Sequence, residues 1–409
     1  MSDDIHDIVI VGGGLAAAKA AETVRSDGFD GNVTVITEEP ERPYERPPLS
    51  KGFLTGDKTV DEVYVHDADF YAQQNIALRV GDAVTELDTA SGEVLTRSGD
   101  RLPYDRLLLA TGATPRRLSL SDRPLDGIVV LRTLADSRRL AERLRAVDHV
   151  TVVGAGWIGC EVAAAARTLG AQVTMVDPLD VPLVRVLGAE VGRVFADLHT
   201  DHDVDVRMGL GVDQAGGTDT VEQVTLTDGS TIDTQLVVVG IGVTPRVDLA
   251  EGARLGVDDG IVVDQTLATH DPRILAAGDA ARAWHPSLGR HIRVEHWANA
   301  LNQGQTAGHN LLGAGESYDR LPYFFSDQYD LGMEYTGHAE DWDRVVFRGA
   351  PERREFLAFW LRDGRVIAGM NVNIWDVMDQ IQTLIRSGVQ VDPSRLANPD
   401  IPLEQLAPR

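Results

Sequence analysis

Two glycine-rich segments of this chain combine residue types and spacing suited to holding phosphate. One reads IVIVGGGLAA over residues 8–17, and the other reads VTVVGAGWIG over residues 150–159. In each, an apolar run predicts a buried strand, the glycines predict a tight turn, and a helix is expected to follow. The first glycine turns the chain, the second lets the backbone approach a pyrophosphate, and the third position keeps helix and strand close. The pyrophosphate is expected on the N–H groups of the helix N-terminus.

Each glycine segment is followed by an acidic residue at the end of the next apolar run. Glu38 comes 24 residues after Gly14, and Asp177 comes 18 residues after Gly159. A distance of about 20 residues is typical of a carboxylate that hydrogen-bonds a ribose 2′-hydroxyl. The sequence therefore predicts two dinucleotide sites. The glycines assigned to them are Gly12 and Gly14 in the first and Gly154, Gly156 and Gly159 in the second.

The acidic residue of the second segment also bears on the choice of nicotinamide donor. A carboxylate at Asp177 within roughly 4 Å of a 2′-phosphate would cost on the order of 1 to 4 kcal/mol. We therefore expect NADH to be preferred over NADPH. Arg185, eight residues further on, is the side chain most able to reverse this preference.

Composition excludes several other functions. The formal net charge of −25 disfavours nucleic acid and anionic membranes, because the field of the protein would repel polyanions. Cys160 is the single cysteine, so the chain has no redox pair and cannot hold an iron–sulfur cluster unaided. The eleven histidines show no metal-binding spacing, and no metal site is expected. With no signal sequence or membrane-length apolar run, the predicted location is the cytoplasm.

The elements that must position these residues repeat along the chain. Apolar strands ending in a turn and proline occur at residues 107–115 and again at 236–245, which indicates two similar folds with the second inserted in the first. Another strand ends in Gly278-Asp279, and helices are expected over 299–312 and 377–386. The predicted fold is α/β, with two Rossmann-like domains arranged as in glutathione reductase and a C-terminal α+β domain. The predicted domains are residues 1–118 with 246–320, residues 119–245, and residues 321–409.

Besides the two glycine segments, the chain contains three further motifs. These are PYERPPLSK over residues 43–51, the AGD strand end at 277–279, and YFFSDQ over 323–328. Together they resemble the FAD-dependent ferredoxin reductase family, of the putidaredoxin reductase and ring-hydroxylating dioxygenase reductase type. The resemblance spans essentially the whole chain. It implies FAD on the first domain, NAD on the inserted domain, and a C-terminal domain that helps to form the flavin side and the docking face.

The resemblance also implies roles for individual residues. Lys51 would lie near the isoalloxazine ring and Glu161 would pair with it near the flavin N5 and the nicotinamide, so this pair is the predicted catalytic pair. Asp279 resembles a ribityl-binding aspartate, and Trp297 would cover the ring. His296 departs from the expected threonine or serine. The full set of implied FAD contacts beyond the glycines is Ala16, Glu38, Arg46, Lys51, Val84, Arg132, Asp279 and Trp297.

The expected reaction is hydride transfer from NADH to FAD, followed by single-electron transfer to a small iron–sulfur ferredoxin of the 2Fe-2S or 3Fe-4S type. That ferredoxin would feed a P450 or a ring-hydroxylating oxygenase. A flavin oxidase or quinone reductase and a flavoprotein like apoptosis-inducing factor, acting mainly through protein interactions, remain alternatives. Because ferredoxins are usually acidic, a basic docking patch is expected at residues 285–293 together with Arg42 and Arg46. An ordinary solvated loop is an equally good interpretation of these residues.

Overall fold

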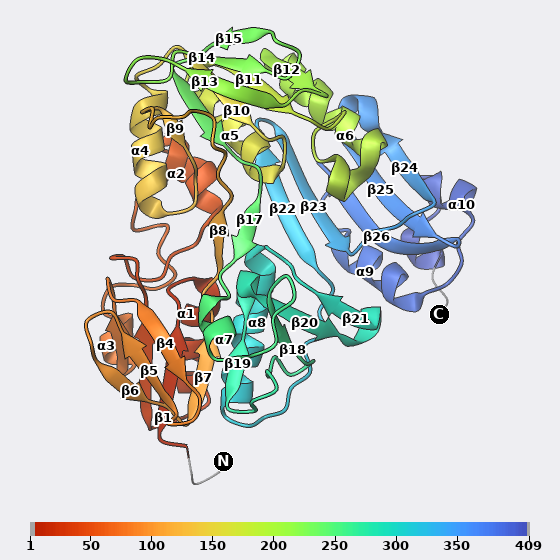
Figure 1. Ribbon diagram of the computed structural model, residues 1–409. Helices are drawn as coiled ribbons and strands as arrows, with labels where there is room; N and C mark the ends of the chain where they lie inside the picture. Colours follow the sequence, from red (N-terminus) through yellow and green to blue (C-terminus); the bar gives the residue numbers. More distant parts are fainter. Residues whose placement is uncertain (1–4, 407–409) are drawn as a thin grey trace. The chain divides into compact units, whose positions relative to one another are not determined.

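The computed structural model describes residues 5–406, which divide into two compact units. The first contains the chain up to Glu45, Thr59–Thr114 and Val243–Arg320; the second contains Arg46–Lys58, Pro115–Gly242 and the chain from Leu321 onward. The chain therefore leaves the first unit and returns to it, as expected for an insertion. Figure 1 shows the elements of each unit in the colours of the sequence.

A five-stranded parallel sheet of order β19-β7-β1-β2-β3 forms the centre of the first unit. Its strands are β1 (Asp7–Val11), β2 (Asn32–Ile36), β3 (Ile76–Arg79), β7 (Arg106–Leu109) and β19 (Ile274–Ala276). Strands β1, β7 and β19 are mostly apolar and buried, as is typical of a parallel sheet covered on both faces, whereas the edge strand β3 is partly exposed. The smaller sheets are antiparallel β4 (Val84–Asp88), β5 (Glu93–Thr96) and β6 (Arg101–Pro103), and a mixed sheet of β18 (Ile261–Val263), β20 (Ala281–His285) and β21 (Arg290–Ile292). Short helices are α3 (Phe70–Gln73) and α7 (Asp248–Gly252).

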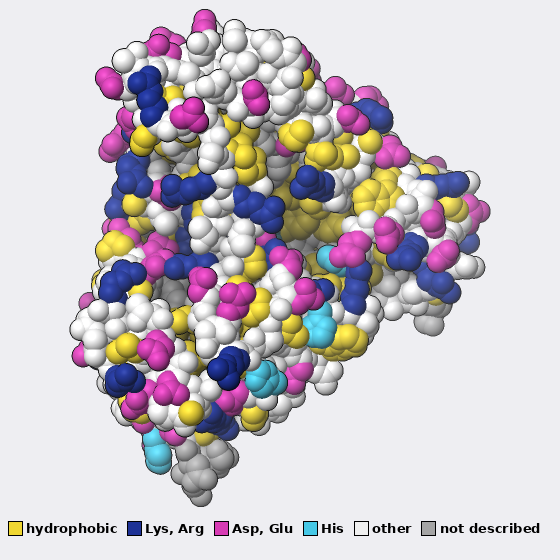
Figure 2. All heavy atoms as spheres, viewed as in Figure 1, with side chains coloured by type: hydrophobic (Ala, Val, Ile, Leu, Met, Phe, Trp, Pro, Cys, Tyr) yellow, Lys and Arg dark blue, Asp and Glu magenta, His cyan; other side chains and the backbone are white. Residues whose placement is uncertain are grey.

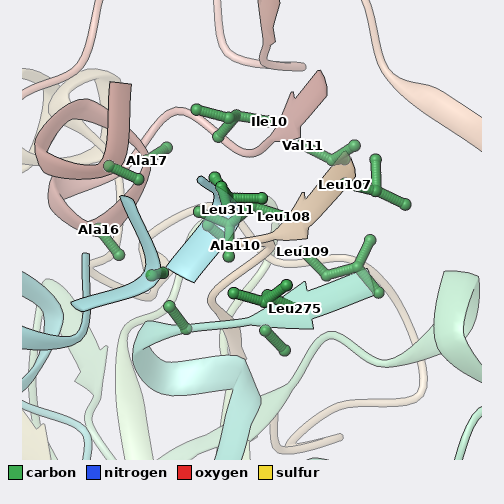
Figure 3. Packing of buried hydrophobic residues seen from close by; sticks show 14 of the residues in the cluster. Ile10, Val11, Ala16, Ala17, Leu107, Leu108, Leu109, Ala110, Leu275 and Leu311 are labelled. Atoms are coloured by element: carbon green, nitrogen blue, oxygen red, sulfur yellow. The ribbon is translucent and has the colours of Figure 1, made fainter. Parts of the chain in front are cut away.

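The core of the first unit depends on small residues where two helices meet. Figure 3 shows Ile10, Leu108 and Leu275 of the sheet within this core, with Ala16 and Ala17 of α1 (Leu15–Ser26) nearby. Helix α1 packs against α8 (Trp297–Leu311). A Cβ at Gly304 of α8 would lie 2.6 Å from the Ala16 carbonyl oxygen. The alanines of α1 and the glycines of α8 thus allow the two backbones to approach closely.

The second unit repeats this plan with the parallel order β12-β11-β10-β16-β9. Its strands are β9 (Ile128–Val129), β10 (His149–Val153), β11 (Gln172–Asp177), β12 (Val204–Met208) and β16 (Leu236–Val239). An antiparallel sheet of β13 (Val212–Gly216), β14 (Gln223–Leu226) and β15 (Thr231–Asp233) corresponds to the β4-β5-β6 sheet of the first unit. The helices are α2 (Gly52–Thr55), α4 (Leu134–Leu144), α5 (Trp157–Thr168) and α6 (Val184–Asp201). Strands β8 (Ala113–Pro115) and β17 (Val243–Pro245) pair where the chain passes between the units.

The C-terminal part of the second unit is an antiparallel sheet of order β22-β23-β26-β25-β24 (Figure 1). Its strands are β22 (Tyr323–Gln328), β23 (Leu331–Gly337), β24 (Arg344–Ala350), β25 (Glu355–Arg362) and β26 (Arg365–Val372). Helices α9 (Met378–Ser387) and α10 (Pro393–Ala397) pack on it, and Phe359, Ile381 and Leu396 are buried between them. On the apolar side of α9, Ile381 and Leu384 are buried, while Ile385 and the N-cap residue Val377 are partly buried.

The predicted fold class is confirmed: two parallel-sheet domains and a C-terminal α+β part. The division into three domains at the predicted boundaries stays a prediction, because compactness groups the chain into two units and assigns residues 46–58 to the second. Helix α8 begins two residues earlier than expected, at Trp297. His296 accounts for this, since its Nδ1 accepts a hydrogen bond from the Ala298 N–H and so caps the helix in place of the expected threonine or serine. None of the helices within residues 5–406 is long and apolar enough to cross a membrane.

Candidate functional site: two nucleotide turns and a buried ion pair

The first glycine turn joins β1 to α1. Gly12 has a φ of +135°, and a Cβ there would lie 2.0 Å from the Ala110 carbonyl oxygen, so only glycine fits. Gly14 is the N-cap of α1, where no side chain caps the helix and a Cβ would meet nothing within 4 Å. The first N–H groups of α1 therefore open onto space next to a backbone without a side chain. This arrangement fits a dinucleotide pyrophosphate.

The second turn joins β10 to α5 and has the same glycine arrangement, but the third position of its motif lies closer to the neighbouring backbone. Gly154 has a φ of +104°, and a Cβ there would lie 2.4 Å from the Gly240 carbonyl oxygen. Gly156, the N-cap of α5, has open space beside it and no side-chain cap. At Gly159 a Cβ would lie 1.8 Å from the Gly154 carbonyl oxygen. The second turn thus also fits a pyrophosphate.

The two predicted ribose carboxylates have different surroundings. Both oxygens of Glu38 accept hydrogen bonds from the Arg246 guanidinium, one of them at 2.9 Å, and this pairing lowers the pKa of Glu38. Asp177 instead accepts two backbone hydrogen bonds, 2.8 Å from the Ala155 N–H and 2.9 Å from the Leu179 N–H. Asp177 is therefore fixed directly to the glycine turn that it is predicted to serve. Arg185 is exposed at the start of α6.

The other predicted FAD contacts are divided between the two units. The first unit contains Val84 at the start of β4, Asp279 in a single helical turn after β19, and half-buried Trp297 at the start of α8. The second unit contains Arg46, Lys51 and Arg132. Arg46 and Arg132 meet there, because the Arg46 guanidinium donates a 2.5 Å hydrogen bond to the Arg132 carbonyl oxygen.

The predicted catalytic pair lies within the second unit, where the structure brings Lys51 and Glu161 into contact. The Lys51 Nζ is 2.8 Å from the Glu161 Oε1, and Glu161 on α5 is only 5% exposed. Lys51 precedes α2, and the segment before it is held by the Ser137 hydroxyl, which donates a 2.7 Å hydrogen bond to the Leu49 carbonyl oxygen. The ammonium also lies 5.6 Å from the centre of the Phe325 ring, within cation–π range.

Sequence reasoning missed the other partners of Glu161. Ser326 of β22 donates a 2.7 Å hydrogen bond to its Oε1, and Ser50 donates one to its Oε2. Burial raises the pKa of nearby Asp327, while Lys51 lowers it and Glu161 raises it further. Both serines stand inside the quoted motifs at 43–51 and 323–328, but nothing in the spacing of those motifs relates them to Glu161. Arg246, the partner of Glu38, carried no sequence signal.

Cys160 is fully buried beside Glu161 on α5. Burial raises the pKa of its thiol, and its Sγ faces the Ala155 carbonyl oxygen at 3.6 Å. It therefore behaves as a small buried apolar group. Within residues 5–406 no group of three or more His, Cys, Asp or Glu side chains is arranged to hold a metal ion.

The residues of the predicted docking patch are largely engaged. Arg293 has an 11% exposed side chain and pairs with Asp259 at 3.3 Å and with Glu295. Arg42 lies over the Tyr64 ring, 3.4 Å from its centre. Next to Arg290 on the same pair of strands, Trp284 is 37% exposed and has an edge contact with His291. On the face in Figure 2, basic and acidic side chains are interspersed.

Two parallel-sheet folds, each with a nucleotide turn, define a two-dinucleotide oxidoreductase. Residues 6–304 match the family described as pyridine nucleotide-disulphide oxidoreductase, and residues 323–407 match the domain described as reductase C-terminal. The chain belongs to the pyridine nucleotide-disulphide oxidoreductase family.

Relatives of known activity match over nearly the full length. The ferredoxin reductase subunit of 5,5'-dehydrodivanillate O-demethylase from Sphingobium sp. is 40% identical, with 98% of each chain covered. The ferredoxin–NAD(+) reductase component of the anthranilate 1,2-dioxygenase system from Burkholderia cepacia is 40% identical over 97% of this chain and 98% of the relative. Putidaredoxin reductase of Pseudomonas putida is 35% identical over 98% and 96%. A crystal structure of the covalent putidaredoxin reductase–putidaredoxin complex matches with a TM-score of 0.94 and 35% identity, covering 98% of each chain.

Proposed function

We propose that this protein is an NADH-dependent FAD enzyme that reduces a small iron–sulfur ferredoxin, which in turn feeds a P450 or a ring-hydroxylating oxygenase. The observation that carries the proposal is the presence of two nucleotide turns in a chain whose one cysteine is buried. Electrons that enter through the nucleotides therefore leave to another molecule and not to a thiol of this chain. The near full-length similarity to ferredoxin reductases of oxygenase systems supports the same conclusion.

The residues on each turn would hold one cofactor. Gly12, Gly14 and the N-terminus of α1 hold the FAD pyrophosphate, and Glu38 holds its ribose. Gly154, Gly156 and Gly159 with α5 hold NADH, whose ribose Asp177 binds. The remaining FAD contacts in this proposal are Ala16, Arg46, Val84, Arg132, Asp279 and Trp297. When bound, FAD accepts two electrons as a hydride from NADH and releases them singly.

Lys51 and Glu161 form the catalytic pair of this proposal. The Lys51 ammonium supplies a positive charge that favours the electron-rich reduced cofactor. Glu161 holds that ammonium at 2.8 Å, and its own negative charge is stabilised by the Ser50 and Ser326 hydroxyls. The pair therefore orients a cation without leaving either charge unpaired.

The ferredoxin-docking surface of this proposal centres on the exposed Trp284 and on Arg290 of the neighbouring strand. Arg293 lies outside its centre because its side chain is only 11% exposed and pairs with Asp259 and Glu295. A double substitution of Trp284 and Arg290 by alanine should raise the KM for ferredoxin and weaken its salt dependence, while NADH oxidation with a small quinone stays at the wild-type rate. The single substitution Arg293→Ala serves as the matched control and should change the KM less. An unchanged KM in the double variant would remove this surface from the proposal.

The test of the function is anaerobic stopped-flow reduction of a panel of 2Fe-2S and 3Fe-4S ferredoxins by the FAD-loaded protein and NADH. At least one ferredoxin should be reduced in preference to quinones and oxygen. Failure with every ferredoxin, with retained quinone or oxygen turnover, would favour an oxidase or quinone reductase. Very slow NADH turnover with a long-lived charge-transfer complex would favour a protein that acts through interactions, as apoptosis-inducing factor does.

Cys160→Ala separates electron transfer from thiol chemistry. It should leave ferredoxin reduction within about twofold of the wild type, because the thiol is buried and protonated. A complete loss of turnover in a folded, FAD-loaded variant would restore a redox role for this cysteine.

The cytoplasm remains our proposed location, which fractionation of the source cells would test.

A further inference from the structure

A continuous line of polar side chains, most of them buried, extends from Glu161 along β22 to His199 of α6 and to Tyr329. The Ser326 Oγ, bound to Glu161, lies 3.2 Å from the Gln328 Nε2. The Gln328 Oε1 lies 3.1 Å from the His199 Nε2, and the His199 Nδ1 lies 3.1 Å from the Tyr329 hydroxyl. Ser326, Gln328 and His199 are each at most 1% exposed. Buried polar groups of this kind nearly always have at least one hydrogen-bond partner.

The chemistry of these groups fixes the direction of every hydrogen bond. An ionised carboxylate at Glu161 accepts only, so the Ser326 hydroxyl must donate to it. The Ser326 oxygen is then left to accept from the Gln328 Nε2, which turns the Gln328 Oε1 towards His199. A carbonyl oxygen accepts only, so the His199 Nε2 must carry the proton. In a neutral ring the His199 Nδ1 is then an acceptor, and the Tyr329 hydroxyl donates to it.

Titration does not disturb this order near neutral pH. Burial lowers the pKa of His199 to about 4, so its ring is neutral. Burial raises the pKa of Tyr329, so its hydroxyl keeps the proton that it donates. Tyr329 also has a φ of +55°, a left-handed conformation that is unfavourable for a bulky residue. Its ring is held there by stacking on His202, with centroids 3.7 Å apart.

We propose that Tyr329, His199, Gln328 and Ser326 are positioning residues that act through Glu161 to hold Lys51 for the electron transfer of the proposed function. Tyr329 donates to the His199 Nδ1 and so favours the Nε2–H tautomer, which keeps the Gln328 amide in this orientation. If that amide turned over, its oxygen would take the Ser326 hydroxyl hydrogen away from Glu161. Because all four donors point the same way, each bond also strengthens the next.

The first measurement reads the hydrogen-bond direction without any turnover. In the FAD-loaded protein labelled with 15N-histidine, His199 should be the neutral Nε2–H tautomer at pH 7, its signals assigned by their loss in His199→Gln. Tyr329→Phe should shift His199 towards a mixture of tautomers. Tyr323→Phe removes a tyrosine hydroxyl at the start of β22 that bonds to Glu334 and not to these residues, and should leave the His199 signals unchanged. A protonated His199 or an Nδ1–H tautomer in the wild type would overturn the proposal.

The second measurement reads the effect on Glu161. Ser326→Ala should lower the limiting rate of flavin reduction by NADH about three- to tenfold while the Kd for NADH stays constant. Gln328→Glu should have the same effect although Ser326 is kept, because a carboxylate at this position accepts the Ser326 hydrogen. An unchanged limiting rate in folded, FAD-loaded Ser326→Ala would overturn the proposal. If NADH failed to reduce the flavin of the wild-type protein, the proposed function would be refuted instead. The tautomer of His199 would still decide in which direction these hydrogen bonds donate.

Discussion

The two glycine turns have the same backbone design but carry different side chains beyond the turn. In the first, Ala17 stands at the third position of the motif, and α1 continues with alanines that pack against the glycines of α8. In the second, Gly159 is required by the close Gly154 carbonyl, and two residues later α5 carries buried Glu161. A common phosphate-binding turn thus serves in one case to bring two helices together and in the other to support a buried charge.

Each turn also has its own acidic residue with its own kind of support. Glu38 is held by the Arg246 side chain, while Asp177 is held by two backbone N–H groups, one of them from its own turn. A side-chain partner can rotate away, whereas a backbone partner cannot. The difference shows that two acidic residues in similar sequence contexts can be held by different kinds of partner.

The largest expected effect distinguishes the buried Lys51–Glu161 ion pair at α5 from the partly exposed Lys19–Glu22 ion pair on α1. Glu161→Gln should lower the free energy of unfolding by about 3–5 kcal/mol, because it leaves the Lys51 charge without its buried partner. It should also slow flavin reduction by NADH at least about tenfold if the pair acts on the reacting cofactor. Glu22→Gln breaks the Lys19–Glu22 pair on α1, which has a similar length of 2.7 Å but is partly exposed, and should change stability by no more than about 1 kcal/mol. Equal losses from both variants would contradict the distinction between the helices. Denaturant unfolding and stopped-flow absorbance measure the two quantities.

Acid should destabilise the protein through His199. Its pKa is about 4 when folded, against 6.5 for an exposed ring, so the unfolded chain binds more protons between these values. The stability contributed by the neutral ring is therefore complete above pH 6.5 and is lost as the pH falls towards 4, by on the order of 3 kcal/mol. Denaturant unfolding from pH 7 to pH 4.5 should show this loss, and His199→Gln should remove it. A variant with the same acid dependence as the wild type would assign the loss to other groups.

Exchange of the third residue of each motif tests the difference between the turns directly. Gly159→Ala places a Cβ 1.8 Å from the Gly154 carbonyl oxygen and should cost about 1–3 kcal/mol of stability, with weaker NADH binding. The reciprocal Ala17→Gly only loosens a helix and should cost about 0.5–1 kcal/mol. Thermal unfolding and NADH titration compare them. If Gly159→Ala bound NADH as the wild type does, the tight third position would have no part in the nucleotide site.

The smallest expected effect concerns nucleotide choice. Asp177→Asn should reduce the ratio of kcat/KM for NADH over NADPH about tenfold, since it removes the charge that repels a 2′-phosphate. Glu38→Gln should leave this ratio unchanged and instead weaken the retention of FAD. A wild-type ratio below one would show that Asp177 does not select the nucleotide. Steady-state kinetics with both donors and release of FAD on dilution provide the measurements.

The sequence by itself determined the local parts of this protein. Glycine spacing predicted both turns, and continuous apolar runs predicted the buried strands next to them. These features depend on residues close together in the chain, where steric and hydrophobic rules apply directly. The roles of Lys51 and Glu161 came from resemblance alone, because 110 residues separate them.

Tertiary structure alone decided which distant side chains meet. It brought Lys51 to Glu161, paired Arg246 with Glu38, and placed Ser326 where its hydroxyl reaches Glu161. It also showed that Arg293, predicted as part of a basic patch, is neutralised by its carboxylate neighbours. Hydrogen bonds and ion pairs require atoms within about 3 to 4 Å, and for residues on different elements that distance is set by how the elements pack. No spacing along the chain encodes it.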